Sequence, residues 1–120
     1  MRSVIIVAAL AVAISTVATS AVQAQGAYPS KPITVIVPFA AGGPTDVVAR
    51  LLGDHMTRTL GQTLVVENIG GAGGSTGMTR VAEAAPDGYV IGVGNMGTQS
   101  AAPALSPNLK YDPAKSFAQV

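Results

Sequence analysis

The sequence contains no cysteine and no tryptophan, a single histidine, and few charged side chains, 11% in total. Without cysteine, the chain can form no disulfide and cannot carry a lipid on an N-terminal cysteine. One histidine without cysteine leaves zinc and Cys–His sites short of ligands, so neither a metal nor a cofactor is expected. No basic run and no mixed basic and aromatic patch is present, which argues against a nucleic-acid partner.

The first residues have the pattern of an export signal. Arg2 precedes an apolar run from Val4 to Ile14, and small and polar residues follow as far as Ala24. We therefore expect a cleavable secretory signal peptide over residues 1–24. An uncleaved anchor is the alternative, although the run is short for a membrane span.

The most informative stretch runs from Ile33 to Asp46. Its first part, Ile33–Pro38, is a β-branched run that suits a strand covered on both faces, with a proline at its end. Gly42 and Gly43 allow a sharp turn, and Pro44 fits the first position of a helix with Gly43 as its N-cap. Asp46 then complements the positive end of the helix dipole. Strand, turn and helix N-terminus together predict a corner that binds anions.

The same strand–turn–helix unit is repeated along the chain, which predicts an α/β fold with a parallel sheet in β-α-β-α-β order. The expected strands are 33–37, 63–67 and 89–93, and the expected helices are 44–60, one that begins at Ser75 or Thr76 and ends before Pro86, and a short one that Pro103 closes. Helical spacing predicts buried faces made by Val48, Leu51, Leu52 and Met56 in the first helix and by Met78, Val81, Ala82 and Ala85 in the second. Gly61 should end the first helix, whose opposite side carries Arg50, Asp54 and Arg58.

The loops that follow the strands are glycine-rich, whereas those that precede them are ordinary turns, so the carboxyl edge of the sheet is the expected binding face. No lysine or arginine lies in these loop tips. An acidic ligand would therefore meet backbone N–H groups, hydroxyls, water and helix dipoles. Asp46 is open to two interpretations. It could be a first-turn residue bonded back to the Gly43 N–H, or it could act in binding, by contacting a hydroxyl or ammonium group of the ligand or by making the loop that holds the ligand rigid.

Other polar residues also have two interpretations. Ser75 and Thr98 would cap helices or contact the ligand, and capping is favoured. Asn68 is interpreted as a turn residue, and His55, in mid-helix, as structural rather than catalytic. Phe39 belongs to the core or to an apolar wall of the site.

Two glycine-rich windows resemble nucleotide-binding patterns. The window from Gly70 to Gly77 lacks the lysine of a P-loop. Residues Gly92 to Gly97 match G-x-G-x-x-G, but the first glycine lies inside the predicted third strand. The alternative function is therefore an exported nucleotide- or dinucleotide-binding enzyme that uses this loop.

Several motifs in sequence order resemble the solute-binding proteins of tripartite tricarboxylate transporters, the Bug-type periplasmic receptors. They are Tyr28–Ile33, Pro38–Asp46, Val66–Asn68 with Gly71–Gly74, Ala85–Tyr89, and Tyr111–Pro113 with Phe117. The resemblance covers essentially all of the chain after the leader.

The resemblance implies a type II periplasmic-binding-protein fold, a periplasmic location, and a non-enzymatic receptor that delivers a small carboxylate to integral membrane permease subunits. Residues 25–103 would form part of a first lobe and residues 104–120 a crossover toward a second lobe that this chain lacks, so the chain is interpreted as an N-terminal fragment of a protein that is monomeric at full length. A structural or signalling role is the further option. The predicted ligand-binding residues are Phe39, Ala40, Gly42, Gly43, Thr45, Asp46, Gly71, Ala72, Gly73, Gly74, Ser75, Thr76, Asn95 and Thr98.

Overall fold

The computed structural model describes residues 27–120, so the predicted signal peptide lies outside the described residues. The elements are, in chain order, β1 (Ile33–Val37), α2 (Pro44–Leu60), β2 (Leu64–Asn68), a 3-10 turn η1 (Ala72–Gly74), α3 (Ser75–Ala82), β3 (Val90–Gly92), a π-helical turn η2 (Gly97–Ala101) and α4 (Ala102–Leu105). No helix within the described range is long and apolar enough to cross a bilayer.

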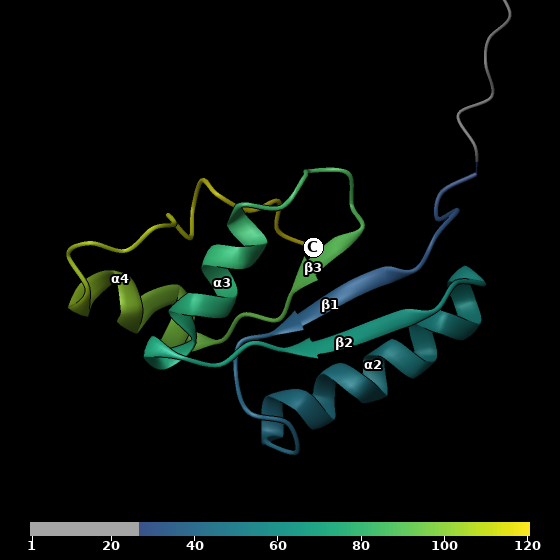
Figure 1. Ribbon diagram of the computed structural model, residues 1–120, viewed down its shortest axis with the longest axis horizontal. Coiled ribbons are helices and arrows are strands. Elements are labelled where there is room, and N and C mark those ends of the chain that lie inside the picture. Colours follow the sequence, from purple (N-terminus) through teal and green to yellow (C-terminus); the bar gives the residue numbers. More distant parts are fainter. Residues whose placement is uncertain (1–26) are drawn as a thin grey trace, which may run out of the picture.

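The strands form a parallel sheet in the order β2-β1-β3, and the predicted β-α-β-α-β arrangement is confirmed (Figure 1). β1 lies in the centre, and its β-branched residues are buried because α2 and α3 cover opposite faces of the sheet. The strand limits differ from the prediction only at the ends. β2 starts at Leu64, and β3 is limited to Val90–Gly92, although the Val93 N–H still donates to the Ile36 carbonyl at 3.0 Å.

The ends of α2 are those that the sequence predicts. Gly43 is the N-cap in an extended conformation, and Pro44 occupies the first turn. Gly61 ends the helix in the left-handed conformation at φ 67°, and its N–H donates to the Thr57 carbonyl at 3.0 Å. The corner between β1 and α2 is therefore fixed by local backbone geometry.

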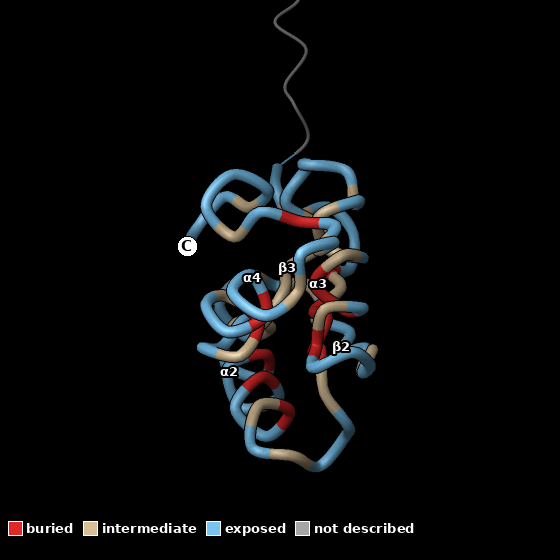
Figure 2. Tube along the Cα trace, turned by 90° about the vertical axis from the view of Figure 1, so that its left-hand side faces the viewer, coloured by how far each residue is buried: buried red, intermediate tan, exposed pale blue. Residues whose placement is uncertain are grey.

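The buried face of α2 is not the predicted one. Val48, Leu51 and Leu52 are 51%, 66% and 57% exposed, whereas the buried residues of the helix are Asp46, Ala49 and Gly53. The small side chains let the helix axis approach the sheet closely, and a Cβ on Gly53 would lie only 3.8 Å from Leu64 Cβ. Figure 2 shows the buried positions of α2 as separate segments among exposed ones. The large apolar residues were expected to be buried, but the close helix–sheet contact favours the smallest ones.

A substitution on the exposed face tests this correction. Leu51→Gln is expected to change the free energy of unfolding of the chain by less than about 0.5 kcal/mol, because the side chain already faces water. Val37→Ala, in the core of β1, should cause a clearly larger loss. The two values come from chemical denaturation followed by circular dichroism. Equal losses for both variants would contradict the assignment of faces.

The second helix follows the prediction more closely. Met78 is 2% exposed and Gly77 is buried against the sheet, and Val81 and Ala82 are half-buried. Ala85, which was predicted to be buried, is exposed because α3 already ends at Ala82.

The helical stretch after β3 does not stop at Pro103. The π-helical turn runs directly into α4, and Pro103 is the second residue of that helix. Beyond α4, Tyr111 is buried and its hydroxyl donates to the Thr98 carbonyl at 2.6 Å. Phe117 contacts the Tyr111 ring at a centroid distance of 5.6 Å. Tyr111 therefore packs against the η2 turn, and Phe117 packs against Tyr111.

Candidate functional site

The loops that follow β1, β2 and β3 meet at the carboxyl edge of the sheet, and Gly74 lies at their meeting point. A Cβ on Gly74 would lie 2.6 Å from Thr98 Cγ2, 3.2 Å from Phe39 Cζ and 3.3 Å from the Pro38 carbonyl oxygen. Gly74 thus touches the loop after β1 and the turn after β3, and it belongs itself to the segment after β2. The predicted site residues from separate motifs are brought to one edge.

Asp46 has a structural role at this edge. Its carboxylate is almost fully buried, at 2% exposure, and accepts hydrogen bonds from Arg50 Nε at 2.9 Å, from the Gly42 N–H at 2.8 Å and from Asn68 Nδ2 at 2.9 Å. The predicted bond to the Gly43 N–H is wrong: that group donates to the Ala40 carbonyl at 3.3 Å instead. The carboxylate bonds one residue further back because Gly42 takes a left-handed φ of 79°.

The surroundings of Asp46 also fix its charge. The Arg50 guanidinium, the Gly42 N–H and the Asn68 amide, in decreasing order of influence, hold the pKa of the Asp46 carboxyl far below its usual range, against a smaller opposing effect of burial. Asp46 is therefore an anion, and the neighbouring guanidinium balances it.

This pKa shift predicts how stability depends on pH. Because the folded-state pKa lies below the unfolded value of about 4, the contribution of Asp46 is complete above that pH and decreases as the pH falls further. Melting temperatures of the chain and of its Asp46→Asn variant should differ by a constant amount from neutral pH to about pH 5 and converge below about pH 4. A difference that widens on acidification would contradict the prediction.

The segment after β2 has an unusual backbone. Gly71, Ala72, Gly73 and Gly74 all have positive φ, at 126°, 47°, 66° and 94°. A left-handed conformation is costly for a residue with a Cβ, so Ala72 is a strained position of the kind that clusters at ligand sites. Ala72 and Gly73 are exposed, and Gly74, which follows them, is the N-cap of α3.

Ser75 and Thr98 do not have the predicted capping roles. Gly74 is the N-cap of α3 without any side-chain hydrogen bond, so the predicted capping role of Ser75 is wrong. Thr98 does not cap a helix either: it lies inside the η2 turn, whose N-cap is Met96, and it forms reciprocal hydrogen bonds with Asn95. Its Oγ1 accepts from the Asn95 N–H at 3.0 Å, and Asn95 Oδ1 accepts from the Thr98 N–H at 3.2 Å. Thr98 is completely buried, so it supports the loop after β3 from the interior of the chain.

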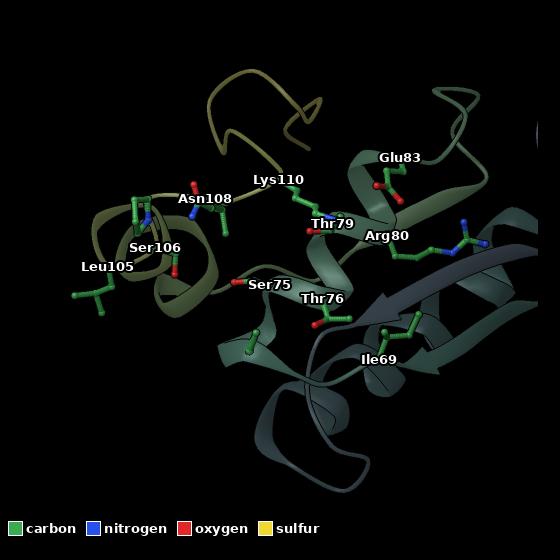
Figure 3. Close-up of a pocket in the computed structure, with 13 residues that line it drawn as sticks. Ile69, Ser75, Thr76, Thr79, Arg80, Glu83, Leu105, Ser106, Asn108 and Lys110 are labelled. Atoms are coloured by element: carbon green, nitrogen blue, oxygen red, sulfur yellow. The ribbon is translucent and has the colours of Figure 1, made fainter.

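A groove of about 730 Å³ adjoins this edge, between α3 and the segment after α4 (Figure 3). Its walls include predicted site residues Ala72, Ser75 and Thr76, and also residues 105–110, which the sequence did not indicate. In Figure 3 the Lys110 side chain extends toward α3 near Thr79, whereas Arg80 points away from residues 105–110. The loop tips lack cationic residues, but Lys110 lines the groove that adjoins them.

The glycines of the G-x-G-x-x-G match serve packing within the chain. A Cβ on Gly92 would lie 2.8 Å from Val81 Cγ2, and the space beside Gly94 is filled by the Gln99 side chain. The absence of a side chain at Gly92 therefore lets α3 pack closely, and its absence at Gly94 leaves space for a side chain of the η2 turn. His55 is exposed on α2, and among residues 27–120 no group of three metal-binding side chains is found.

A parallel sheet whose helix-opening loops converge at its carboxyl edge belongs to the class of α/β domains that bind ligands at that edge. The solved structures that it resembles include periplasmic binding proteins. The chain belongs to the tripartite tricarboxylate transporter family receptors, the TctC family, whose profile matches residues 48–120. Members of this family are periplasmic solute-binding receptors and not enzymes.

Similar proteins support the assignment. The UPF0065 protein in the TAR-I ttuE-ttuC' intergenic region of Agrobacterium vitis is 54% identical over 98 residues, which are 82% of this chain and 28% of that protein. Periplasmic binding protein BugD is 57% identical at a TM-score of 0.72, over 75% of this chain and 30% of BugD.

Two solved relatives contain a ligand. MatC from Rhodopseudomonas palustris with bound malate is 56% identical at a TM-score of 0.72, over 75% of this chain and 31% of MatC. A second R. palustris protein, with adipate, is 33% identical at a TM-score of 0.70, over 72% of this chain and 29% of that protein. The chain thus spans about a third or less of the length of these relatives.

Proposed function

We propose that this chain is part of a periplasmic solute-binding protein that captures a small carboxylate and delivers it to the integral membrane subunits of a tripartite tricarboxylate-type transporter. The observation that carries the proposal is the convergence at Gly74 of the loops after all three strands. Each loop opens a helical segment, so N–H groups and the positive ends of helix dipoles face a common edge.

The ligand class has two supports. Structural neighbours of this chain contain malate and adipate, which are both dicarboxylates of small size. The exposed loop tips of this chain carry no acidic side chain that would repel such a ligand, since Asp46 is buried and bonded to Arg50. A few charge-assisted hydrogen bonds of about 1.5–3 kcal/mol each are enough for micromolar affinity, which needs about 8 kcal/mol.

The geometry narrows the predicted contacts. Asp46 and Thr98 are buried, and the N–H of the exposed residue Gly42 is bonded to Asp46. We therefore propose that Gly42, Asp46 and Thr98 shape the site rather than touch the ligand. The residues proposed to face the ligand are the accessible ones of the predicted set, namely Phe39, Ala40, Gly43, Thr45, Gly71, Ala72, Gly73, Ser75, Thr76 and Asn95. Gly74 would join the loops, as its contacts indicate.

The remaining parts of the proposal concern the whole protein. A cleavable signal over residues 1–24 would export it, residues 25–103 would belong to the first lobe, and residues 104–120 would lead toward a second lobe. The complete receptor would act as a monomer. The second lobe would supply the other wall of the site, so the present chain alone should bind malate only weakly, with a Kd above about 1 mM.

A hybrid receptor tests the function. In it, residues 27–120 of this chain replace the matched 31% of MatC. Isothermal titration with malate, adipate and, as a control, NAD should show micromolar binding of at least one dicarboxylate and none of NAD. The chain without the MatC portion serves as a second control. Binding of NAD alone, or tight malate binding by the isolated chain, would overturn the proposal.

A further inference from the structure

Arg50 and Asn68 complete a closed hydrogen-bonded ring with Asp46, here called the Asp46–Arg50–Asn68 ring. Besides the bonds of Asp46 to both residues, Arg50 Nη2 donates to Asn68 Oδ1 at 3.1 Å. The ring joins the first turns of α2 to the last residue of β2, the strand that follows α2 in the chain and against which the helix packs.

The ring holds the β1–α2 loop at two points. Asn68 Nδ2 also donates to the Phe39 carbonyl at 3.1 Å, which fixes the start of the loop. Asp46 accepts from the Gly42 N–H at 2.8 Å, which fixes its end. Between these points lie Ala40 and Ala41, both exposed, and within residues 27–120 their N–H groups have no hydrogen-bond partner.

The charges of Asp46 and Arg50 also suit the ring to holding the β1–α2 loop. The Asp46 side chain is 3% exposed, and the Arg50 side chain is 51% exposed, so the carboxylate is enclosed while the guanidinium covers it from the solvent side. The planar fork of arginine donates to two acceptors at once, one on Asp46 and one on Asn68, which a lysine ammonium cannot do with the same geometry. The Arg50 guanidinium is thus bonded to two acceptors of the chain, although about half of its side chain is exposed.

We propose that Arg50 and Asn68 are positioning residues, which act through Asp46 to present the Ala40 and Ala41 N–H groups to a ligand carboxylate. The inference rests on the proposed function, because it assigns the two N–H groups to a carboxylate at the loop edge. It goes beyond the predicted contacts, in which Arg50 belonged to a solvated helix face and Asn68 to a turn.

The test uses the hybrid receptor with four single substitutions, Arg50→Lys, Arg50→Ala, Asn68→Asp and Asn68→Ala. A double variant combines Arg50→Ala with Asn68→Ala. The matched control is Arg58→Ala, because Arg58 lies on the same helix and its Nε donates only to the Asp54 carbonyl at 3.1 Å, remote from the loop. Malate affinity is measured by titration, and exchange of the Gly42 amide proton is measured by NMR.

Asn68→Asp and Arg50→Ala should each weaken malate binding by at least about tenfold, which corresponds to the loss of one charge-assisted hydrogen bond. Both substitutions should accelerate exchange of the Gly42 amide proton. Arg50→Lys should lose less malate affinity than Arg50→Ala. The double variant should lose less affinity than the product of the losses of Arg50→Ala and Asn68→Ala. Arg58→Ala should remain within about twofold of the parent. Strictly multiplicative losses, or affinities unchanged by both ring substitutions, would overturn the proposal.

The exchange measurement separates the two hypotheses. If the parent hybrid binds no dicarboxylate, the proposed function fails, but faster Gly42 exchange in the ring variants would still show that the ring fixes the loop. If the parent binds malate and Gly42 exchange is unchanged in every ring variant, the positioning role fails while the function stands. If Arg50→Ala does not fold, Arg50→Lys takes its place in the comparison, because it retains a positive charge beside Asp46.

Discussion

Gly74→Ala is expected to destabilise the chain by roughly 2–5 kcal/mol, the sum of a left-handed backbone penalty and of overpacking. Gly74 has φ 94°, and an added methyl group would lie 2.6 Å from Thr98 Cγ2 and 3.3 Å from the Pro38 carbonyl oxygen. Thr98 cannot move aside easily, because it is fully buried and bonded to Asn95 and Tyr111. The three loops would therefore separate, and any ligand affinity of the hybrid receptor would fall with the stability.

Gly73→Ala is the matched control. Gly73 also has a positive φ, 66°, but an added Cβ would meet nothing within 4 Å. Only the backbone penalty of about 1–2 kcal/mol should remain. Chemical denaturation of both variants separates the two contributions. If Gly74→Ala costs no more than Gly73→Ala, the close approach of the loops at Gly74 is wrong.

Two helical glycines should respond to alanine with opposite signs. At Gly77 in α3, a Cβ would lie 2.6 Å from the Ile69 carbonyl oxygen and 2.9 Å from Pro38 Cα, both backbone atoms. Gly77→Ala is therefore expected to destabilise by up to about 2 kcal/mol, because an overpacking cost of about 1–3 kcal/mol exceeds a gain of about 1 kcal/mol in helix propensity. At Gly53 in α2 the nearest atom is Leu64 Cβ at 3.8 Å, an ordinary contact.

Gly53→Ala should consequently stabilise the chain by about 0.5–1 kcal/mol, the difference in helix propensity. Thermal and urea unfolding of the two variants, each against the parent chain, measure the signs directly. A stabilising Gly77→Ala would show that α3 lies further from the end of β1 than the structure indicates. A destabilising Gly53→Ala would show that α2 tolerates no additional methyl group against β2.

The local features of the fold could be predicted from the sequence because each depends on a few adjacent residues. Gly43, Pro44 and Gly61 define the ends of α2 through backbone conformations that only these residue types favour. The β-branched run of β1 similarly indicated a strand that is covered on both faces. These elements carry the convergence of the loops at one edge.

The buried face of α2 could not be predicted in the same way. Apolar residues occur around much of this helix, so periodicity selected the largest ones, whereas the sheet accepts Ala49 and Gly53 because they permit a closer approach. The partner of Arg50 was also missed. Its spacing of four residues from Asp46 was visible, but the burial of Asp46 and its contact with Asn68 depend on the register between α2 and β2.

The exposed apolar face of α2 has a practical consequence. Val47, Val48, Leu51 and Leu52 are all about half exposed or more on neighbouring turns of one helix. Such a patch favours self-association in concentrated solution. Light scattering over a dilution series is therefore the appropriate quality check before any titration of the purified chain, and polar replacements on this face offer a way to keep it dispersed.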